Sequence, residues 1–280
     1  MNDATETTVE PSDAGAGVRV RVPALSYFFP AHNEAENIEA LVEEALAELG
    51  SLAETFEIIA VDDGSTDGTA EMADALATAH PEVVRVVHHP TNLGYGAAVR
   101  SGIRASRHPL ICFTDGDRQF RIADIGRLTA ELDPGGGPPD VVAGYRIRRA
   151  DATIRLAYAR GYRLALRTFF GLRVRDPDCA CKLFRVEALE GVNVESGGAF
   201  LSAELLIKIQ ERGGDIAETG VPHYPRTAGQ ASGADPRVVL RAMKDFWSLR
   251  LRLWLRRDSA LSKGEPLVDP AARRSTTNGD

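Results

Sequence analysis

The sequence predicts an α/β protein built on a mostly parallel sheet with helices on both faces. Short apolar runs rich in β-branched and aromatic residues alternate with amphipathic stretches of helical length, which is typical of this class. Three of these runs end in polar residues just before a predicted helix, at 30–34, 62–69 and 115–119. Because parallel strands end at one edge of a sheet, we expect these polar residues to converge there.

The predicted elements follow one another regularly along the chain. Strands are predicted at 25–29, 56–61, 83–87, 109–113 and 140–144, and helices at 35–49, 69–79, 94–106 and 121–132. The proline- and glycine-rich stretch 134–139 is predicted to be a loop. Beyond residue 146 the pattern changes, with helices predicted at 152–170, 200–212 and 236–257 and a strand at 216–222.

Composition indicates one large domain with appendages. The 280 residues are 44% hydrophobic, which is enough for a sizeable core. We expect the main domain over 23–235, an amphipathic helix over 236–257, and disordered tails over 1–22 and 258–280, where apolar periodicity is absent. The net charge of -7 gives no general attraction to nucleic acid, so no nucleic-acid partner is expected.

Cysteines and apolar runs bear on the location of the protein. The three cysteines, Cys112, Cys179 and Cys181, are odd in number, and the spacing of the last two does not suit zinc. We therefore predict buried free thiols, as in a reducing cytosol. The first residues lack the basic and apolar regions of a secretory signal, and no run of about eighteen apolar residues predicts a membrane span. A cytoplasmic protein is expected.

The predicted helix over 236–257 mixes tryptophan, phenylalanine and leucine with arginine and lysine. This mixture is typical of a helix that lies in a membrane interface, and it predicts peripheral contact with the inner face of the cell membrane. The alternative is a helix whose apolar side packs on the core while its basic side chains are solvated. The sequence leaves both open.

Asp115 and Asp117 carry the strongest chemical signal in the chain. They flank Gly116 directly after a predicted buried strand. Carboxylate oxygens at such a position suit Mg²⁺ or Mn²⁺ shared with substrate phosphates. Taken alone, such a pair is usually a polar turn, so its meaning depends on the two motifs upstream, Pro30-Ala31-His32-Asn33-Glu34 and Val61-Asp62-Asp63-Gly64-Ser65.

With these two motifs, the stretch from Asp115 to Gln119 resembles the signature of inverting family 2 glycosyltransferases. Within that family the chain is most similar to the polyprenyl (dolichyl) phosphate mannose or glucose synthase branch, over residues 25–247. The resemblance implies a GT-A-like, Rossmann-like fold. It also implies metal-dependent transfer of a hexose from a GDP- or UDP-sugar to a polyprenyl phosphate at the membrane surface, with Mg²⁺ or Mn²⁺ as the cofactor.

The resemblance implies a role for each matching residue. The nucleotide sugar is expected to contact Pro30, His32, Glu34, Val61, Asp63, Gly94, Asp115, Gly116 and Asp117. Asp63 would bind the edge of the base, and Gly94 opens a glycine-rich turn before a helix, where phosphate is favoured. The metal is expected on Asp117 and Gln119, whereas Asp67 is interpreted as a turn or cap residue.

Phosphate or acceptor contacts are expected from Arg146, Lys182 and Arg226, and two departures from the family pattern occur among them. Lys182 stands in an arginine position, which removes the bidentate fork of a guanidinium. Arg226 is retained, but the lysine expected shortly after it is absent, because Gly233 follows Ser232.

Glu204 is the third expected catalytic residue, beside Asp115 and Asp117. In relatives that glycosylate hydroxyls, this carboxylate region supplies the general base, and the alternative is a buried acceptor that orients nearby groups. A soluble transferase acting on a hydroxyl of a small molecule or glycan, with Glu204 as base, is therefore the second functional reading. A catalytically silent nucleotide-sugar-binding protein is the third.

Overall fold

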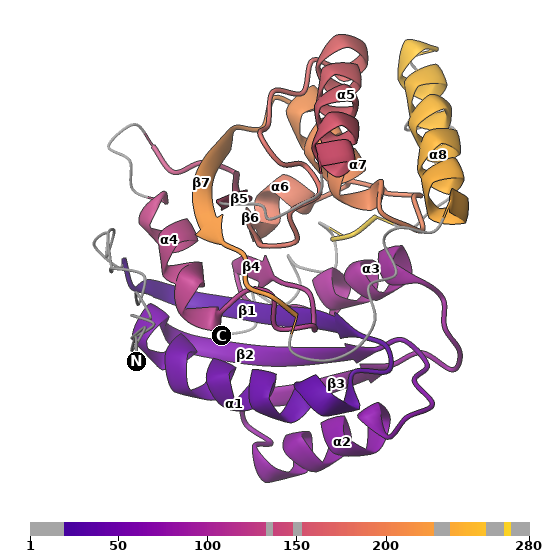
Figure 1. Cartoon of the computed structure of the whole chain (residues 1–280). Coiled ribbons are helices and arrows are strands. Elements are labelled where there is room, and N and C mark those ends of the chain that lie inside the picture. The colour runs from indigo at the N-terminus through magenta and orange to yellow at the C-terminus, as the bar shows by residue number, and fades with distance from the viewer. Residues whose placement is uncertain (1–19, 133–136, 148–152, 227–235, 256–265, 270–280) are drawn as a thin grey trace, which may run out of the picture.

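A seven-stranded mixed sheet forms the centre of the molecule (Figure 1). The computed structural model describes residues 20–132, 137–147, 153–226, 236–255 and 266–269. In these residues the strand order is β3-β2-β1-β4-β6-β5-β7. All strands run parallel except β6, which is antiparallel to both β4 and β5. The mostly parallel sheet predicted from the sequence is thus confirmed.

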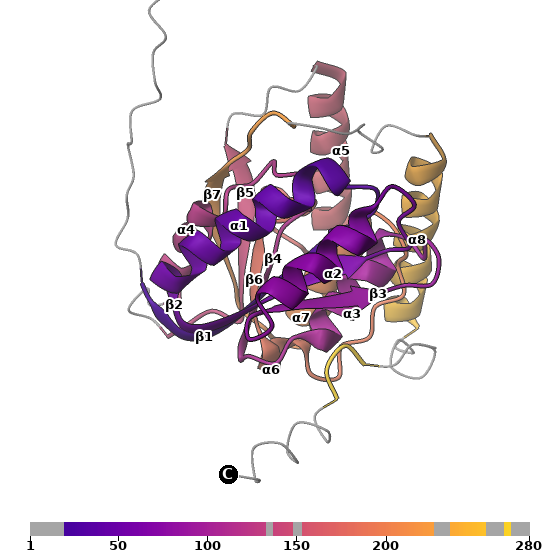
Figure 2. The same cartoon turned by 90° about the horizontal axis from the view of Figure 1, so that it is seen from below.

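The first half of the chain follows the predicted alternation closely. Its elements are β1 (Val22–Ala31), α1 (Ala35–Leu52), β2 (Ala53–Asp62), α2 (Thr69–Ala79), β3 (Val84–His88), α3 (Tyr95–Ala105) and β4 (Leu110–Phe113). Figure 2 shows α1 and α2 side by side across one face of the sheet. On the opposite face, Gly102 of α3 lies directly against the ring of Phe28, where a side chain would collide. Helices therefore cover both faces.

The second half departs from simple alternation. It contains a short helix at Ile122–Asp124, α4 (Ile125–Ala130), β5 (Val141–Ile147), α5 (Thr153–Phe170), β6 (Lys182–Arg185), α6 (Val186–Leu189), α7 (Leu201–Glu211), β7 (Ile216–Pro222) and α8 (Pro236–Trp254). Strand β6 was not predicted. Its four residues begin and end with a cation, so it lacks the apolar run that identifies a buried strand.

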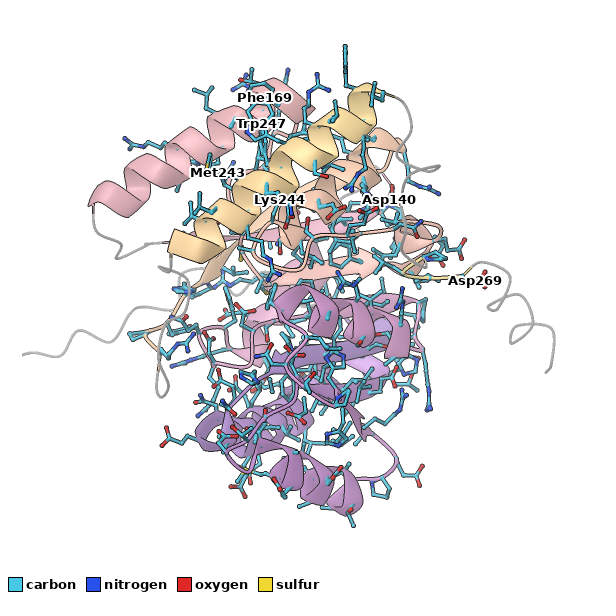
Figure 3. All side chains as sticks on the ribbon, turned by 90° about the vertical axis from the view of Figure 1, so that its right-hand side faces the viewer. Asp140, Phe169, Met243, Lys244, Trp247 and Asp269 are labelled. Carbon is cyan, nitrogen blue, oxygen red and sulfur yellow. The ribbon has the colours of Figure 1, made fainter. Side chains whose placement is uncertain are left out.

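Helices α5 and α8 stand side by side, away from the first half of the sheet (Figure 1). They meet through aromatic rings: Phe169 lies 5.1 Å from Trp247 and Phe170 lies 4.9 Å from Phe246, centroid to centroid. Figure 3 shows Phe169 and Trp247 at this junction. Helix α8 buries Phe246 and Leu249, so part of its apolar side packs on the protein.

Part of the C-terminal tail, residues 266–269, is ordered, contrary to the expectation of disorder. Residues 1–19, 256–265 and 270–280 lie outside the described residues. Residues 266–269, however, contact the core: Leu267 is buried, and its amide donates to the Val192 carbonyl at 2.9 Å. The prediction of a tail without structure from 258 is therefore wrong for this segment, because one apolar side chain anchors it.

Two further predictions concern the state of the cysteines and the presence of membrane-spanning helices. All three cysteines are buried and free, as predicted. Among the described residues, no helix combines the length and apolar character needed to cross a bilayer.

Candidate active site

The ends of three neighbouring strands form the candidate site. Strand β1 pairs with β2 on one side and β4 on the other, so the residues after Ala31, Asp62 and Phe113 are adjacent. The amide of Asp63 donates to the Ala31 carbonyl at 2.8 Å. Gly116 lies so close to the Pro30 carbonyl oxygen that an added Cβ would approach it to 2.7 Å. The predicted convergence of the three motifs is thus confirmed.

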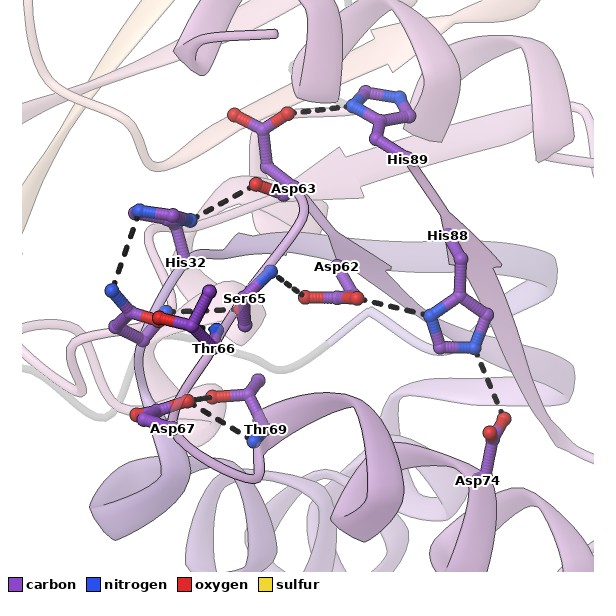
Figure 4. Close-up of polar contacts among 11 residues, drawn as sticks. His32, Asp62, Asp63, Ser65, Thr66, Asp67, Thr69, Asp74, His88 and His89 are labelled. Atoms are coloured by element: carbon purple, nitrogen blue, oxygen red, sulfur yellow. Dashed lines mark hydrogen bonds and ion pairs between the residues drawn. The ribbon is translucent and has the colours of Figure 1, made fainter. Parts of the chain in front are cut away.

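Asp63 connects the second motif to the glycine-rich turn and to His89, and Figure 4 shows the contact with His89. Its carboxylate is almost fully buried and accepts hydrogen bonds from His89 Nδ1 at 2.6 Å, Leu93 N at 2.9 Å and Gly94 N at 2.8 Å. His89 is held in turn by Ser101 at 2.8 Å through Nε2. The carboxylate therefore fixes the turn that precedes α3, and the edge of a base would have to share these oxygens.

The first motif is tied to the second by short hydrogen bonds. His32 Nδ1 donates to the Asp63 carbonyl at 2.9 Å. Asn33 has a positive φ of 56°, and its side-chain oxygen accepts the Thr66 amide at 2.9 Å. Burial raises the pKa of Glu34, although a hydrogen bond from Asn37 opposes the shift. These contacts hold His32 and Glu34 beside the edge where β1 and β2 end.

Asp67 acts as the predicted turn and cap residue. One oxygen accepts the Thr69 amide at 3.1 Å, at the start of α2, and the other accepts the Ala35 amide at 3.2 Å, at the start of α1. A single carboxylate therefore satisfies donors at two helix N-termini, where backbone amides lack partners within the helix.

Asp115 and Asp117 lie together at the end of β4. Removal from water and the neighbouring charge of Asp117 raise the pKa of Asp115 to about 6, despite a hydrogen bond from Tyr95. Oδ1 of Asp115 is buried and accepts no hydrogen bond within the described part of the chain. Oδ2 of Asp117 accepts from Arg226 Nη2 at 2.6 Å, and Oδ1 accepts from the Gln119 amide at 3.1 Å.

These oxygens fit a divalent cation such as Mg²⁺ or Mn²⁺. The unpartnered oxygen of Asp115 and the mutual repulsion of the two carboxylates are both relieved by a positive ion between them. No group of three or more histidine, cysteine or acidic side chains suited to a metal occurs in the described residues. Mg²⁺ characteristically takes only one or two carboxylates and completes its shell with phosphate and water. Gln119 is fixed nearby, since its Nε2 donates to the Tyr224 carbonyl at 3.2 Å.

A cavity of about 280 Å³ opens between the end of β5 and the middle of α5. Arg146 lines it and forms a bidentate ion pair with Asp176, with N–O distances of 2.6 and 2.8 Å. Burial opposes the charge of Arg146, but Asp176 outweighs it and raises the pKa of the guanidinium. Three more arginines line it, Arg160, Arg163 and Arg175. The other lining residues are Tyr145, Ala159, Tyr162, Asp176, Pro177 and Asp178. Four arginines line the cavity but only two aspartates do, so the lining carries excess positive charge and is suited to an anion.

Lys182 lies beneath this cavity rather than in its wall. The side chain is 0% exposed, and Nζ donates to the backbone carbonyls of Pro177 and Cys179. Burial lowers the pKa of this amine, whereas nearby Asp176 and Asp178 oppose the shift. Lys182 thus holds the loop that carries Asp176, while the phosphate contact expected of it would need the amine to leave these partners.

Glu204 is also fully buried, in the first turn of α7. Its oxygens accept the Ser196 amide at 2.8 Å and the Glu195 amide at 3.2 Å, and Lys208 Nζ lies 3.1 Å from Oε1. The structure therefore brings Asp115, Asp117 and Arg226 together but keeps Glu204 apart, inside the protein. Of the two readings of Glu204, these contacts favour the buried acceptor.

Comparison with known proteins assigns the family. Residues 26–192 match the family described as glycosyl transferase family 2. The chain belongs to this family. The dodecaprenyl-phosphate galacturonate synthase of Rhizobium johnstonii is 31% identical over 192 residues, covering 68% of this chain and 55% of that protein. The dolichyl-phosphate beta-glucosyltransferase ALG5C of Trichomonas vaginalis is 31% identical over 217 residues, covering 70% and 62%. The family 2 chain thus spans less than two thirds of either relative.

A solved structure supports the fold of the family 2 chain. Glucosyl-3-phosphoglycerate synthase from Mycobacterium tuberculosis, in complex with Mn²⁺, uridine diphosphate and glucosyl-3-phosphoglycerate, superposes with a TM-score of 0.62. The match covers 82% of this chain and 80% of that one, at 22% identity. The expected GT-A-like α/β fold is therefore confirmed.

Sequence reasoning missed two contributors to the site of the family 2 chain. Tyr95 hydrogen-bonds Asp115, and its position directly after Gly94 was the available signal. His89 supports Asp63, but no local pattern marks it, because its partners lie 26 residues before and 12 residues after it.

Proposed function

We propose that the chain transfers a hexose from a GDP- or UDP-sugar to a polyprenyl phosphate, with inversion at the anomeric carbon and with Mg²⁺ or Mn²⁺ as cofactor. Family membership and the two relatives named for polyprenyl or dolichyl phosphate support this activity. The structural neighbour that binds Mn²⁺ and uridine diphosphate supports the donor class and the metal.

The donor would lie along the ends of β1, β2 and β4. In this proposal the base and ribose contact Pro30, His32, Glu34, Val61 and Asp63, the phosphates approach Gly94, and the sugar reaches Asp115, Gly116 and Asp117. Asp115 and Asp117, with Gln119, would hold the cation, which as a Lewis acid would stabilise charge on the departing diphosphate. Gly116 packs against the Pro30 carbonyl, which supports a single donor site shared by the ends of β1 and β4.

The acceptor phosphate would enter the arginine-lined cavity. Arg146 and the arginines around it offer positive charge beyond that matched by Asp176 and Asp178. An oxygen of the phosphate would attack the anomeric carbon as the bond to the nucleoside diphosphate breaks, with Arg226 close to the leaving group. Lys182 would support this site from beneath by holding the Pro177 and Cys179 carbonyls, in place of a direct phosphate contact.

The burial of Glu204 carries the choice of acceptor. A hydroxyl acceptor needs a base within hydrogen-bond reach of its proton. The carboxylate of Glu204 is enclosed and engaged with two backbone amides and the Lys208 ammonium. A phosphate oxygen is already ionised near neutral pH and needs no such base. The geometry therefore supports a phosphate acceptor over a hydroxyl acceptor with Glu204 as base.

A row of exposed apolar side chains on α8 supports peripheral membrane contact. Leu240, Met243, Trp247, Leu251 and Trp254 recur every three or four residues, so they share one face of the helix, and all are exposed. Tryptophan and leucine beside basic residues favour the interface of an anionic bilayer. This surface would bring the cavity to a lipid-linked phosphate.

The test is product formation with matched acceptors. The protein is incubated with a panel of GDP- and UDP-sugars and Mn²⁺, with a polyprenyl phosphate in one series and the corresponding polyprenol in the other. We expect a glycosylated product, identified by mass, only with the phosphate. Two outcomes would contradict the proposal: product with the polyprenol but not with the phosphate, and no product with either acceptor for any donor in the panel.

A further inference from the structure

The segment 195–197 lies against the start of α3, with backbone packed on backbone. Gly96 N donates to the Gly197 carbonyl at 3.2 Å, and Arg100 Nη1 donates to the Ser196 carbonyl at 3.0 Å. A side chain at Gly96 would come within 2.9 Å of the Gly197 carbonyl carbon, so the glycine allows this close approach. The position of the segment therefore sets the position of the first turn of α3.

The first turn of α3 belongs to the candidate donor site. Gly94 N donates to Asp63 at 2.8 Å, and Tyr95 hydrogen-bonds Asp115. A shift of this turn would change the contacts of both carboxylates. Segment 195–197, whose Ser196 is 96 positions from Arg100, thus supports this turn from outside the donor site.

Glu204 holds segment 195–197 from the other side. Its carboxylate accepts the amides of Glu195 and Ser196, at 3.2 and 2.8 Å. Lys208, one helical turn later, neutralises the buried charge at 3.1 Å and donates to the Asn193 carbonyl. The carboxylate and the ammonium together therefore fix the chain from residue 193 to residue 196.

Helix α8 reaches the same segment through Arg252. Its Nη1 forms an ion pair with the Glu195 carboxylate, and its Nη2 lies 3.7 Å from Glu204 Oε1. The Arg252 side chain is mostly buried at this point. A continuous set of contacts therefore runs from α8 through segment 195–197 to Gly96, and then to Tyr95 and Asp115.

We propose that Glu204 and Arg252 are positioning residues for the donor site. Glu204 clamps segment 195–197 against the start of α3, and Arg252 makes α8 part of the clamp. This inference rests on the proposed function, since the turn that it positions is the one assigned to the nucleotide sugar. It gives Glu204 a role in donor binding that involves no proton transfer.

The test measures nucleotide affinity in the full chain. UDP and GDP, each with Mn²⁺, are titrated by calorimetry into the native protein and into Arg252→Gln, Arg252→Lys and Glu204→Gln. Arg252→Gln should weaken binding of the nucleotide that the native protein prefers by about threefold to thirtyfold, the range for positions that act through a packed network. Arg252→Lys, which keeps the charge, should recover part of the loss. Glu204→Gln should act in the same direction.

A matched control separates positioning from general loss of stability. Arg212→Gln removes a guanidinium that follows α7 and donates to the Glu190 carbonyl rather than to segment 195–197. It should leave nucleotide affinity unchanged at a similar melting temperature. If Arg252→Gln binds as tightly as the native protein, the clamp is refuted and the proposed function stands. If the native protein binds neither nucleotide, both are refuted.

Discussion

The guanidinium of Arg226 donates to Oδ2 of Asp117 at 2.6 Å, joining two residues that are 109 positions apart. Arg226 follows the end of β7, and Asp117 follows the end of β4. The arginine thus places a positive charge on the carboxylate that is expected to hold a divalent cation. Metal and guanidinium would compete for the same oxygen, and an arginine displaced from Asp117 would then meet donor phosphate.

Arg226→Met therefore separates the two roles of this arginine. Without the competing charge, Mn²⁺ alone should bind several-fold more tightly, because the Asp117 oxygen is available. UDP or GDP in the presence of Mn²⁺ should bind more weakly, because a charge-assisted contact is lost. Free Mn²⁺ is measured by electron paramagnetic resonance and nucleotide by calorimetry. Weaker Mn²⁺ binding in Arg226→Met than in the native protein would contradict the competition.

Asp117→Asn tests the metal site directly. The amide keeps the shape of the carboxylate but removes its charge, so Mn²⁺ binding should be lost and hexose transfer should fall by at least about 10²-fold. Asp215→Asn is the control. Asp215 precedes β7, whereas Arg226, the partner of Asp117, follows it, so this variant should leave Mn²⁺ binding and hexose transfer unchanged. Full turnover of the native protein in excess EDTA would exclude metal dependence.

Asp63→Asn should affect both stability and nucleotide binding. The carboxylate accepts three hydrogen bonds, and an asparagine would present an NH₂ group to donors already in place. We expect a loss of roughly 1–3 kcal/mol in the free energy of unfolding. Affinity for UDP and GDP should also fall, because the 93–94 turn loses its anchor. Denaturant unfolding and calorimetry check the two effects, and an unchanged unfolding curve would argue against the anchoring role.

The His88 network predicts a pH dependence of stability. A hydrogen bond to Asp62 raises the pKa of His88 from 6.5, burial opposes this, and Asp74 adds to it (Figure 4). The stabilisation by the charged imidazole is therefore complete below about pH 6.5 and is lost as the pH rises through the higher folded pKa. Because the side chain is 39% exposed, the effect should stay below about 1 kcal/mol.

The measurement is the difference in unfolding free energy between the native protein and His88→Gln across this pH range. The difference should shrink as the pH rises. Asp74→Asn removes one of the two acidic partners, and it should reduce the pH dependence. A difference that grows with pH would show that the neutral imidazole is the stabilising form.

Vesicle binding tests the apolar face of α8. The native protein should float with vesicles containing anionic lipid, less so at high salt, because screening weakens the attraction of basic residues. Leu251→Asp and Trp254→Ser, each on the exposed row, should reduce flotation without changing nucleotide affinity. Native protein that stays with the aqueous fraction at every lipid composition would refute the membrane contact.

The sequence by itself determined the sheet-and-helix alternation and the three motif turns. Alternating periodicities, strand-ending polar residues and helix-start signals are local properties, so 30–34, 62–69 and 115–119 could be assigned to strand ends without coordinates. Parallel pairing then brings such ends to one edge, which is why His32, Asp63 and Asp115 were expected together. The free cysteines and the capping role of Asp67 also follow from local composition and spacing.

Only the tertiary structure decided what the isolated charged residues do. Strand β6 lies between β4 and β5 although it has just four residues, because its neighbours supply the pairing that its own sequence does not signal. Lys182 and Glu204 were expected to meet substrate, but both are enclosed and satisfied by backbone groups. Burial and partner choice depend on segments that are distant in sequence, so the contacts of Arg226 with Asp117 and of Arg252 with Glu195 emerge only from the packed fold.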